Sequence, residues 1–127
     1  MATIDVAIVS IDGSIWSGKA SSVTTTTVEG ELGILPNRQP ILAEMATDGV
    51  VTVHTEDGEY LVFAVTGGLL SCTGSVVTVL AEHAYSAKDL SVAELQQQLA
   101  SLPESAHVED RTTLKAKLRA AQRLSAS

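Results

Sequence analysis

Alternating apolar and polar positions dominate the first two thirds of the chain and predict short β-strands. Ile4, Val6 and Ile8 recur at every second position, and residues 23–28 form a threonine-rich, β-branched run. Residues 50–54 (VVTVH) and 59–65 (EYLVFAV) flank a Glu-Asp-Gly turn, which is the pattern of a β-hairpin. The runs LLSC and VVTVLAE follow, each next to a glycine-containing turn. We therefore expect an antiparallel β-sandwich, or flattened barrel, over residues 1–85.

The periodicity changes after about residue 84, where a helix is predicted. Ser91 and Glu94 have the spacing of a capping box, and Pro103 marks the end of the helix. The apolar positions between them repeat at helical spacing: Leu95, Leu99 and Leu102.

A second helix is expected after a short connection. Glu109 and Asp110 place negative charge at its N-terminus, where the helix dipole favours it. Its predicted apolar stripe consists of Leu114, Leu118 and Ala121. Residues 86–127 therefore read as an αα-hairpin whose helices are too short to be stable alone.

Composition restricts the setting of this domain. The only cysteine, Cys72, has no partner for an internal disulfide, which suits a reducing compartment such as the cytoplasm. The N-terminus does not resemble a signal peptide, and no apolar run reaches the ~18 residues of a membrane span. We expect a soluble protein without direct membrane insertion.

Charge is distributed unevenly along the chain, whose net charge is −7. Ten acidic and three basic residues precede Asp89, whereas five of each lie from there to the C-terminus. Because phosphate is repelled by an acidic body, we expect no nucleic-acid partner. The basic residues of the tail include four spaced by four, which predicts one basic stripe on the second helix: Arg111, Lys115, Arg119 and Arg123. An ordinary solvated helix face is the alternative interpretation.

Residues 30–40 (GELGILPNRQP) hold two glycines and two of the three prolines of the chain. Glycine permits positive φ and proline fixes φ, so we predict an exposed loop of defined shape here. Such a loop commonly contacts a partner.

These motifs together resemble the epsilon subunit of the bacterial F-type ATP synthase. The resemblance covers the whole chain and rests on residues 30–36 (GELGILP) with Pro40 beyond, on Trp16-Ser17-Gly18, and on Gly67-Gly68 followed by residues 76–81. It implies a non-catalytic rotor component of the central stalk. The implied partners are the gamma subunit, the polar loops of the membrane ring and, through the C-terminal helices, the catalytic head of alpha and beta subunits. The implied location is the cytoplasmic face of the bacterial plasma membrane.

The resemblance also implies roles for individual residues. Glu31 would contact a basic loop of the ring, with Arg38 in the same segment as a second contact; solvation of a turn is the alternative role of Glu31. The basic stripe would meet an acidic segment of the catalytic beta subunits and inhibit ATP hydrolysis. Members of the family that bind ATP carry aspartate and arginine where this chain has Ser91 and Glu94, so we expect no bound nucleotide or other cofactor.

Other classes of function find little support in the sequence. His54, His83 and His107 lie far apart, so neither a metal site nor acid–base catalysis is indicated. A free-standing β-sandwich that binds a carbohydrate or peptide is the rival hypothesis. The chain has only four aromatic residues, which leaves few for a ligand platform.

Overall fold

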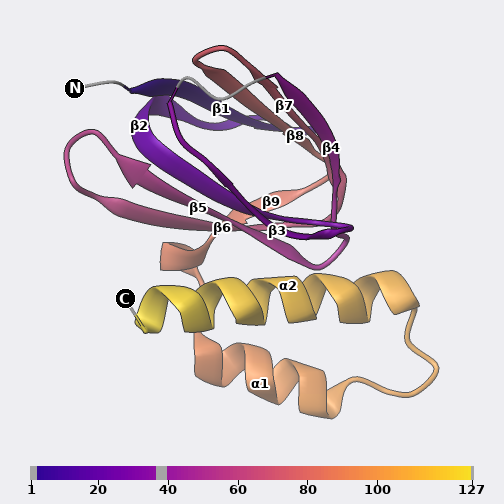
Figure 1. Cartoon of the computed structure of the whole chain (residues 1–127). Coiled ribbons are helices and arrows are strands. Elements are labelled where there is room, and N and C mark those ends of the chain that lie inside the picture. The colour runs from indigo at the N-terminus through magenta and orange to yellow at the C-terminus, as the bar shows by residue number, and fades with distance from the viewer. Residues whose placement is uncertain (1–2, 37–39, 127) are drawn as a thin grey trace.

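The computed structural model describes residues 3–36 and 40–126, in which a β-sandwich is followed by two α-helices (Figure 1). The expected architecture of a sandwich with a C-terminal helical hairpin is thereby confirmed. The elements in chain order are β1 (Ile4–Ser10), β2 (Gly13–Thr27), β3 (Gly30–Ile34), β4 (Ile41–Met45), β5 (Gly49–Thr55), β6 (Tyr60–Val65), β7 (Gly68–Thr73), β8 (Val76–Ala81), β9 (Ala84–Ser86), the short 3₁₀ helix η1 (Ala87–Asp89), α1 (Val92–Ser101) and α2 (Val108–Ser125).

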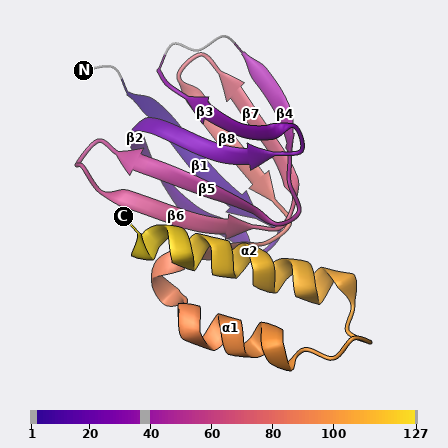
Figure 2. The same ribbon diagram turned by 60° about the horizontal axis from the view of Figure 1, so that its bottom comes forward.

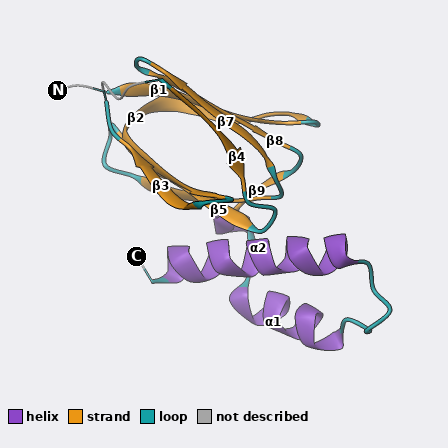
Figure 3. Cartoon of the chain, turned by 45° about the vertical axis from the view of Figure 1, so that its right-hand side comes forward, coloured by secondary structure: helices purple, strands orange, loops and turns teal. Residues whose placement is uncertain are grey.

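Two layers of strands form the sandwich, and the long strand β2 takes part in both. Its first half pairs with β1, and its second half pairs with β5 and β3. One layer has the order β1-β8-β7-β4, and the other has the order β3-β2-β5-β6-β9. Figure 3 shows the two layers from the side, with the helices below the layer that contains β5.

One strand pair departs from the purely antiparallel arrangement expected from the sequence. β1 pairs with β8 in the parallel direction, with Val6 opposite Val77 and Ile8 opposite Val79. Only strands joined by a tight hairpin must be antiparallel. Since six strands separate β1 from β8 in the chain, their connection is long enough to bring them together in the same direction.

Aliphatic side chains fill the space between the two layers. The predicted alternation in β1 is confirmed, because Ile4, Val6 and Ile8 are buried while Asp5 is exposed. The same core contains buried residues from the other strands, among them Val23, Ile34, Met45, Val53, Leu70, Val77 and Val79. This core involves no residue of either α-helix.

The Gly67-Gly68 corner between β6 and β7 requires glycine at its second position. Gly68 has φ of +122°, and a Cβ atom there would overlap the backbone carbonyl oxygen of Leu80. The close approach of β7 and β8 at this corner therefore depends on the missing side chain.

The first half of the segment predicted as a shaped loop is a strand, so that prediction was wrong for residues 30–34. Residues 30–34 form β3, with Thr26 of β2 opposite Glu31. Leu32 and Ile34 turn towards the core while Glu31 and Gly33 are exposed, which is the period-2 pattern of a strand. The two glycines of the segment hid this alternation in the sequence. Residues 37–39, including Arg38, lie outside the described part of the chain.

Helix α1 begins with the predicted cap. The hydroxyl oxygen of Ser91 accepts a hydrogen bond of 3.3 Å from the backbone N–H of Glu94. Leu95 is buried, whereas Leu99 and Leu102 are half-buried.

Helix α2 lies between the sandwich and α1 (Figures 1 and 2), and it therefore packs on two sides. The predicted stripe of Leu114, Leu118 and Ala121 is half-buried or buried, and none of the three belongs to the cluster that joins α2 to β5 and β6. The side against the sandwich is made by Ala116 and Ala120, both completely buried. Small side chains at this face allow the helix to lie close to β5 and β6, but they add little to the hydrophobic pattern from which a stripe is predicted.

Candidate interaction surfaces

The titratable side chains in the described residues do not form a metal-binding cluster. No group of three or more His, Cys, Asp and Glu residues is placed to hold a metal ion there. His83 Nδ1 lies 3.7 Å from the Asp12 carboxylate at the surface, and His54 packs on the ring of Tyr60. Cys72 is buried in the core. The surfaces that remain are suited to binding partners.

The outer face of the β1-β8-β7-β4 layer is not covered by the helices, and it carries exposed apolar side chains beside polar ones such as Glu44, Ser71 and Thr78. Leu80 lies opposite Leu69 on β7 and opposite Val9 on β1, so these side chains form a row across three strands. Leu42 lies one row along on β4, on the same face. Leu69, Leu80 and Leu42 are 45%, 50% and 71% exposed. A cluster of exposed large apolar side chains commonly marks a protein interface.

This apolar face was not predicted from the sequence, although a signal was present. β7 and β8 carry apolar residues at consecutive positions, as in Leu69-Leu70 and Val79-Leu80, and only one of each pair can face the core. A strand that is apolar on both sides indicates that its outer side is covered in the assembled protein.

Glu31 lies on the opposite layer, near the C-terminal end of α2. Its side chain is 56% exposed, and Oε2 lies 3.7 Å from Nη2 of Arg123. The predicted ring contact and one member of the predicted basic stripe are therefore neighbours. Arg38, the other predicted contact, falls outside the described residues.

The basic stripe on α2 is divided between contacts within the chain and solvent. Arg119 Nη1 forms an ion pair with Oδ2 of Asp48 at 2.8 Å and donates a hydrogen bond of 3.2 Å to the carbonyl oxygen of Asp48. Arg111 donates a hydrogen bond to the carbonyl oxygen of Pro103 in the helix connection. Lys115 is exposed and has no ion-pair partner among the described residues.

The acids that pair with the stripe come from the sandwich rather than from the helix itself. The sequence pattern does not reveal these pairs, because Asp48 and Glu31 are far from α2 in the chain. Arg119 and Arg123 hold α2 against the sandwich through Asp48 and Glu31, and Lys117 adds a cation–π contact at 4.2 Å from the centre of the Tyr85 ring.

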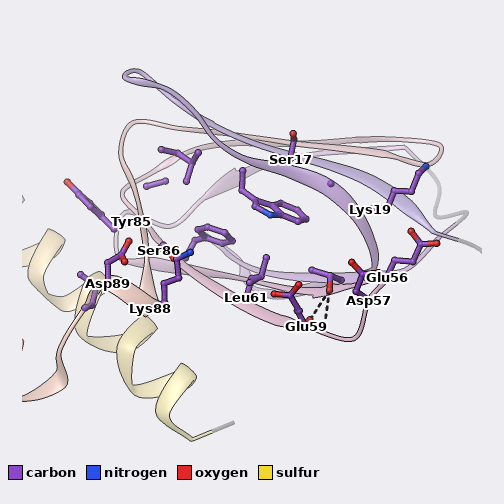
Figure 4. Close-up of a pocket in the computed structure, with 17 residues that line it drawn as sticks. Ser17, Lys19, Glu56, Asp57, Glu59, Leu61, Tyr85, Ser86, Lys88 and Asp89 are labelled. Carbon is purple, nitrogen blue, oxygen red and sulfur yellow. Dashed lines mark hydrogen bonds between the residues drawn. The ribbon is translucent and has the colours of Figure 1, made fainter.

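A groove opens between the two layers where the first half of β2 faces β6 and β9 (Figure 4). Its volume is about 860 Å³, and its apolar lining includes Trp16, Leu61 and Phe63. Lys19, Glu56 and Asp57 lie at one end in Figure 4, and Tyr85, Lys88 and Asp89 lie at the other. Lys19 binds Asp5 at 3.0 Å, and this hydrogen bond raises the pKa of Lys19 above its ordinary value.

The Trp16-Ser17-Gly18 motif acquires a structural reason in this groove. A Cβ atom at Gly18 would lie 2.8 Å from Cζ2 of Trp16. The indole therefore occupies the space that a larger residue at position 18 would need. The side of the indole away from Gly18 continues into the core, where its centroid lies 6.5 Å from that of Phe63.

Comparison with known proteins places this arrangement in context. A family model described as ATP synthase, Delta/Epsilon chain, β-sandwich domain, matches residues 3–87. The ATP synthase epsilon chain of Corynebacterium diphtheriae is 45% identical over 122 residues, which cover 96% of this chain and 99% of that one. The ATP synthase epsilon chain of Rhodococcus erythropolis is 40% identical and is covered over 99% of its length, against 97% of this chain.

Solved structures share the fold. A chain in the mitochondrial ATP synthase of Euglena gracilis, in an assembly of OSCP, F1 and c-ring, aligns with a TM-score of 0.74 at 21% identity, covering 99% of this chain and 81% of that one. A chain in the central stalk and c-ring of the Tetrahymena thermophila enzyme aligns with a TM-score of 0.59 at 14% identity, covering 95% of each. At these identities the alignments speak for the fold alone.

The sequence matches extend over the sandwich and the hairpin together, and they do not favour the rival hypothesis of a free-standing binding module. The chain belongs to the ATP synthase epsilon chain family, whose members are non-catalytic subunits of the F-type ATP synthase.

Proposed function

We propose that this protein joins the gamma subunit to the membrane ring in the rotor of a proton-translocating ATP synthase. The observation that carries the proposal is the asymmetry of the sandwich. One layer is covered by α2, whereas the opposite layer exposes the apolar row of Leu69 and Leu80. Burial of an exposed leucine is favourable by about 1.5–3 kcal/mol, so this face is suited to a lasting contact. We assign the face to the gamma subunit.

The assignment is tested by placing charge on the apolar face. Replacing both Leu69 and Leu80 by Glu should abolish co-purification with gamma, because two carboxylates would be desolvated in the interface. The matched control is Val108→Glu, at a residue 79% exposed at the start of α2. Because Leu69 lies opposite both Leu80 and Glu44, the new carboxylates repel one another, so gamma binding is measured at a temperature where circular dichroism shows the double variant to be folded. Unchanged gamma binding by the double variant would rule out this face.

The ring contact is assigned to the end of the sandwich that carries Glu31. An exposed carboxylate on a strand is held more firmly than one on a free loop, which suits a contact that turns with the rotor. Glu31→Arg should weaken proton pumping in the intact complex more than it changes ATP hydrolysis by the detached head. Normal pumping by this variant would remove Glu31 from the ring interface.

The hairpin is assigned a regulatory role in which it inhibits ATP hydrolysis by reaching the catalytic head. Arg111 and Lys115 are the stripe residues best placed for an acidic partner, because neither pairs with an acid among the described residues. In this assignment Arg119 and Arg123 act first in holding the hairpin on the sandwich.

We assign no nucleotide-binding role to the hairpin. Ser91 and Glu94, which stand where aspartate and arginine occur in ATP-binding relatives, are used here as the N-terminal cap of α1. Calorimetry with ATP and magnesium should give no binding heat for the wild type. Binding in the micromolar range would overturn this assignment, and binding gained by Ser91→Asp with Glu94→Arg would trace the loss to these two positions.

The proposed location is the cytoplasmic face of the plasma membrane, where the protein would be peripheral to the membrane-embedded ring. None of the helices within the described residues has the length and apolar character of a membrane span.

A further inference from the structure

Two ion pairs of different quality connect α2 with the sandwich. Arg119 binds Asp48 through both the carboxylate, at 2.8 Å, and the backbone carbonyl, at 3.2 Å. Arg123 approaches Glu31 only to 3.7 Å, and more than half of the Glu31 side chain is open to solvent. The pair between Arg119 and Asp48 is therefore the firmer contact. The longer pair between Arg123 and Glu31 leaves the Glu31 carboxylate open to another cation.

The apolar contact beneath these pairs is small. On the α2 side it is made by the methyl groups of Ala116 and Ala120 together with the half-buried Leu124, against Val50, Val62 and Ala64 of the sandwich, with Tyr60 and Tyr85 packed at its border. Because an alanine buries little apolar area, the loss of even one ion pair changes the docking free energy by a measurable fraction.

We propose that Glu31 is shared by two opposing interactions, so that engagement of the membrane ring by Glu31 loosens the docked hairpin. The inference rests on the ring contact assigned above. When a cation of the ring approaches the exposed side of the carboxylate, it repels the Arg123 guanidinium on the other side and takes part of the negative charge that held it. Arg123 is then attracted less strongly, and α2 undocks more often.

The coupling works equally in both directions. If ring binding weakens the docking of the hairpin, docking of the hairpin weakens the Glu31 contact with the ring by the same factor. An exposed ion pair changes an equilibrium by less than about five-fold. Ring binding therefore shifts the fraction of molecules with a docked hairpin by a small factor and does not undock the hairpin completely. The ion pair between Arg119 and Asp48 still connects α2 with the sandwich.

The first part of the test uses the isolated full-length protein and needs no ring. Hydrogen exchange of α2 amides reports docking, because most of the stability of a helix in a protein comes from the packing of its apolar face. Glu31→Gln should speed exchange about two- to five-fold, and Asp48→Asn should speed it at least as much. Glu29→Gln is the matched control, since Glu29 is exposed, lies two residues away and has no ion-pair partner among the described residues. Equal exchange in the Glu31 and Glu29 variants would overturn the proposal.

The second part compares the catalytic head with the bound rotor subunits, with and without the membrane ring. In the wild type the ring should speed α2 exchange, and in Glu31→Gln it should make no difference. Asp48→Asn should keep the response to the ring, because it leaves Glu31 in place. If exchange in the wild type is the same with and without the ring, Glu31 is not shared.

The two assignments can fail separately. Defective proton pumping by Glu31→Arg, combined with ring-independent exchange, would keep the ring contact and remove the competition. Normal pumping by Glu31→Arg would remove the ring contact itself and the competition with it.

Discussion

Arg119 and Asp48, 71 positions apart in the chain, are joined through both the carboxylate and the backbone carbonyl of the aspartate. The acceptors lie in the turn between β4 and β5, and the donor lies on the face of α2 that meets the sandwich. One guanidinium thus holds both the side chain and the backbone of the turn. Among the described residues this is the shortest ion pair between the hairpin and the sandwich.

Removal of the contact between Arg119 and Asp48 should lower the free energy of unfolding of the protein. We expect Arg119→Ala to lower the free energy of unfolding by about 0.5–1 kcal/mol, near the upper end for a partly exposed pair. Urea denaturation followed by circular dichroism measures the change. Lys115→Ala, on the same helix and without an ion-pair partner among the described residues, should stay within about 0.5 kcal/mol of the wild type. Equal losses in both variants would show that Arg119 contributes no more than an ordinary surface charge.

The two halves of the basic stripe should differ in their effect on hydrolysis. Replacing Arg111 and Lys115 by Ala should raise ATP hydrolysis of the assembled enzyme and leave the hairpin docked, because neither residue binds the sandwich. Replacing Arg119 and Arg123 should speed hydrogen exchange of α2 in addition. Alanine keeps helix propensity, so loss of the helix should not interfere. Hydrolysis rates that match the wild type for both double variants would return the stripe to an ordinary solvated face.

Replacement of Gly18 should destabilise the fold even when the new residue is alanine. Gly18→Ala forces the Trp16 indole to move, because the added Cβ would lie 2.8 Å from Cζ2, and the expected loss of stability is about 1 kcal/mol, at the low end for overpacking. Gly33→Ala is the control, since a Cβ atom there meets no other atom within 4 Å. The midpoint of thermal unfolding should fall for the first variant and stay level or rise slightly for the second. An unchanged midpoint for Gly18→Ala would mean that the indole relocates without cost.

A chain that ends at Tyr85 should remain folded and should bind gamma. The sandwich core contains no residue of either helix, so its packing survives the loss of the hairpin. The truncation does uncover Val50, Val62 and Ala64, and we expect stronger binding of a hydrophobic fluorescent dye than in the full chain. Replacing Val50 and Val62 by Thr in the short chain should reduce that dye signal. An unfolded short chain would show that the hairpin is part of the folding unit.

The sequence predicts those parts of the fold that depend on local pattern. Alternation identified β1, and the Ser91 cap located the start of α1, because in each case neighbouring residues decide the structure. Residues 30–34 were read as a loop because glycine weakens the apparent alternation, although Leu32 and Ile34 keep it. The sequence predicted only one of the two packed sides of α2. The leucine pattern indicated one side, whereas the contact with the sandwich is made by two alanines, Ala116 and Ala120, which a hydrophobic pattern does not single out.

Contacts between distant segments could not be predicted from the sequence. The parallel pairing of β1 with β8 is decided by how the two layers close, and no short motif encodes it. The same holds for Glu31, which was interpreted as a residue facing outward only. Its position near Arg123 follows from the docking of a helix that lies about ninety residues further along the chain.

Trp16 is the single tryptophan of the chain, and it lines the groove between the layers. When tryptophan is excited at wavelengths that the two tyrosines do not absorb, the emission of this protein therefore comes from one known position. A partner that fills the groove would exclude water from the Trp16 indole and shift its emission maximum to shorter wavelengths. Undocking of α2 would reach the indole only through Tyr85, which Lys117 contacts at the far end of the groove. The protein thus carries its own optical probe for occupation of the groove.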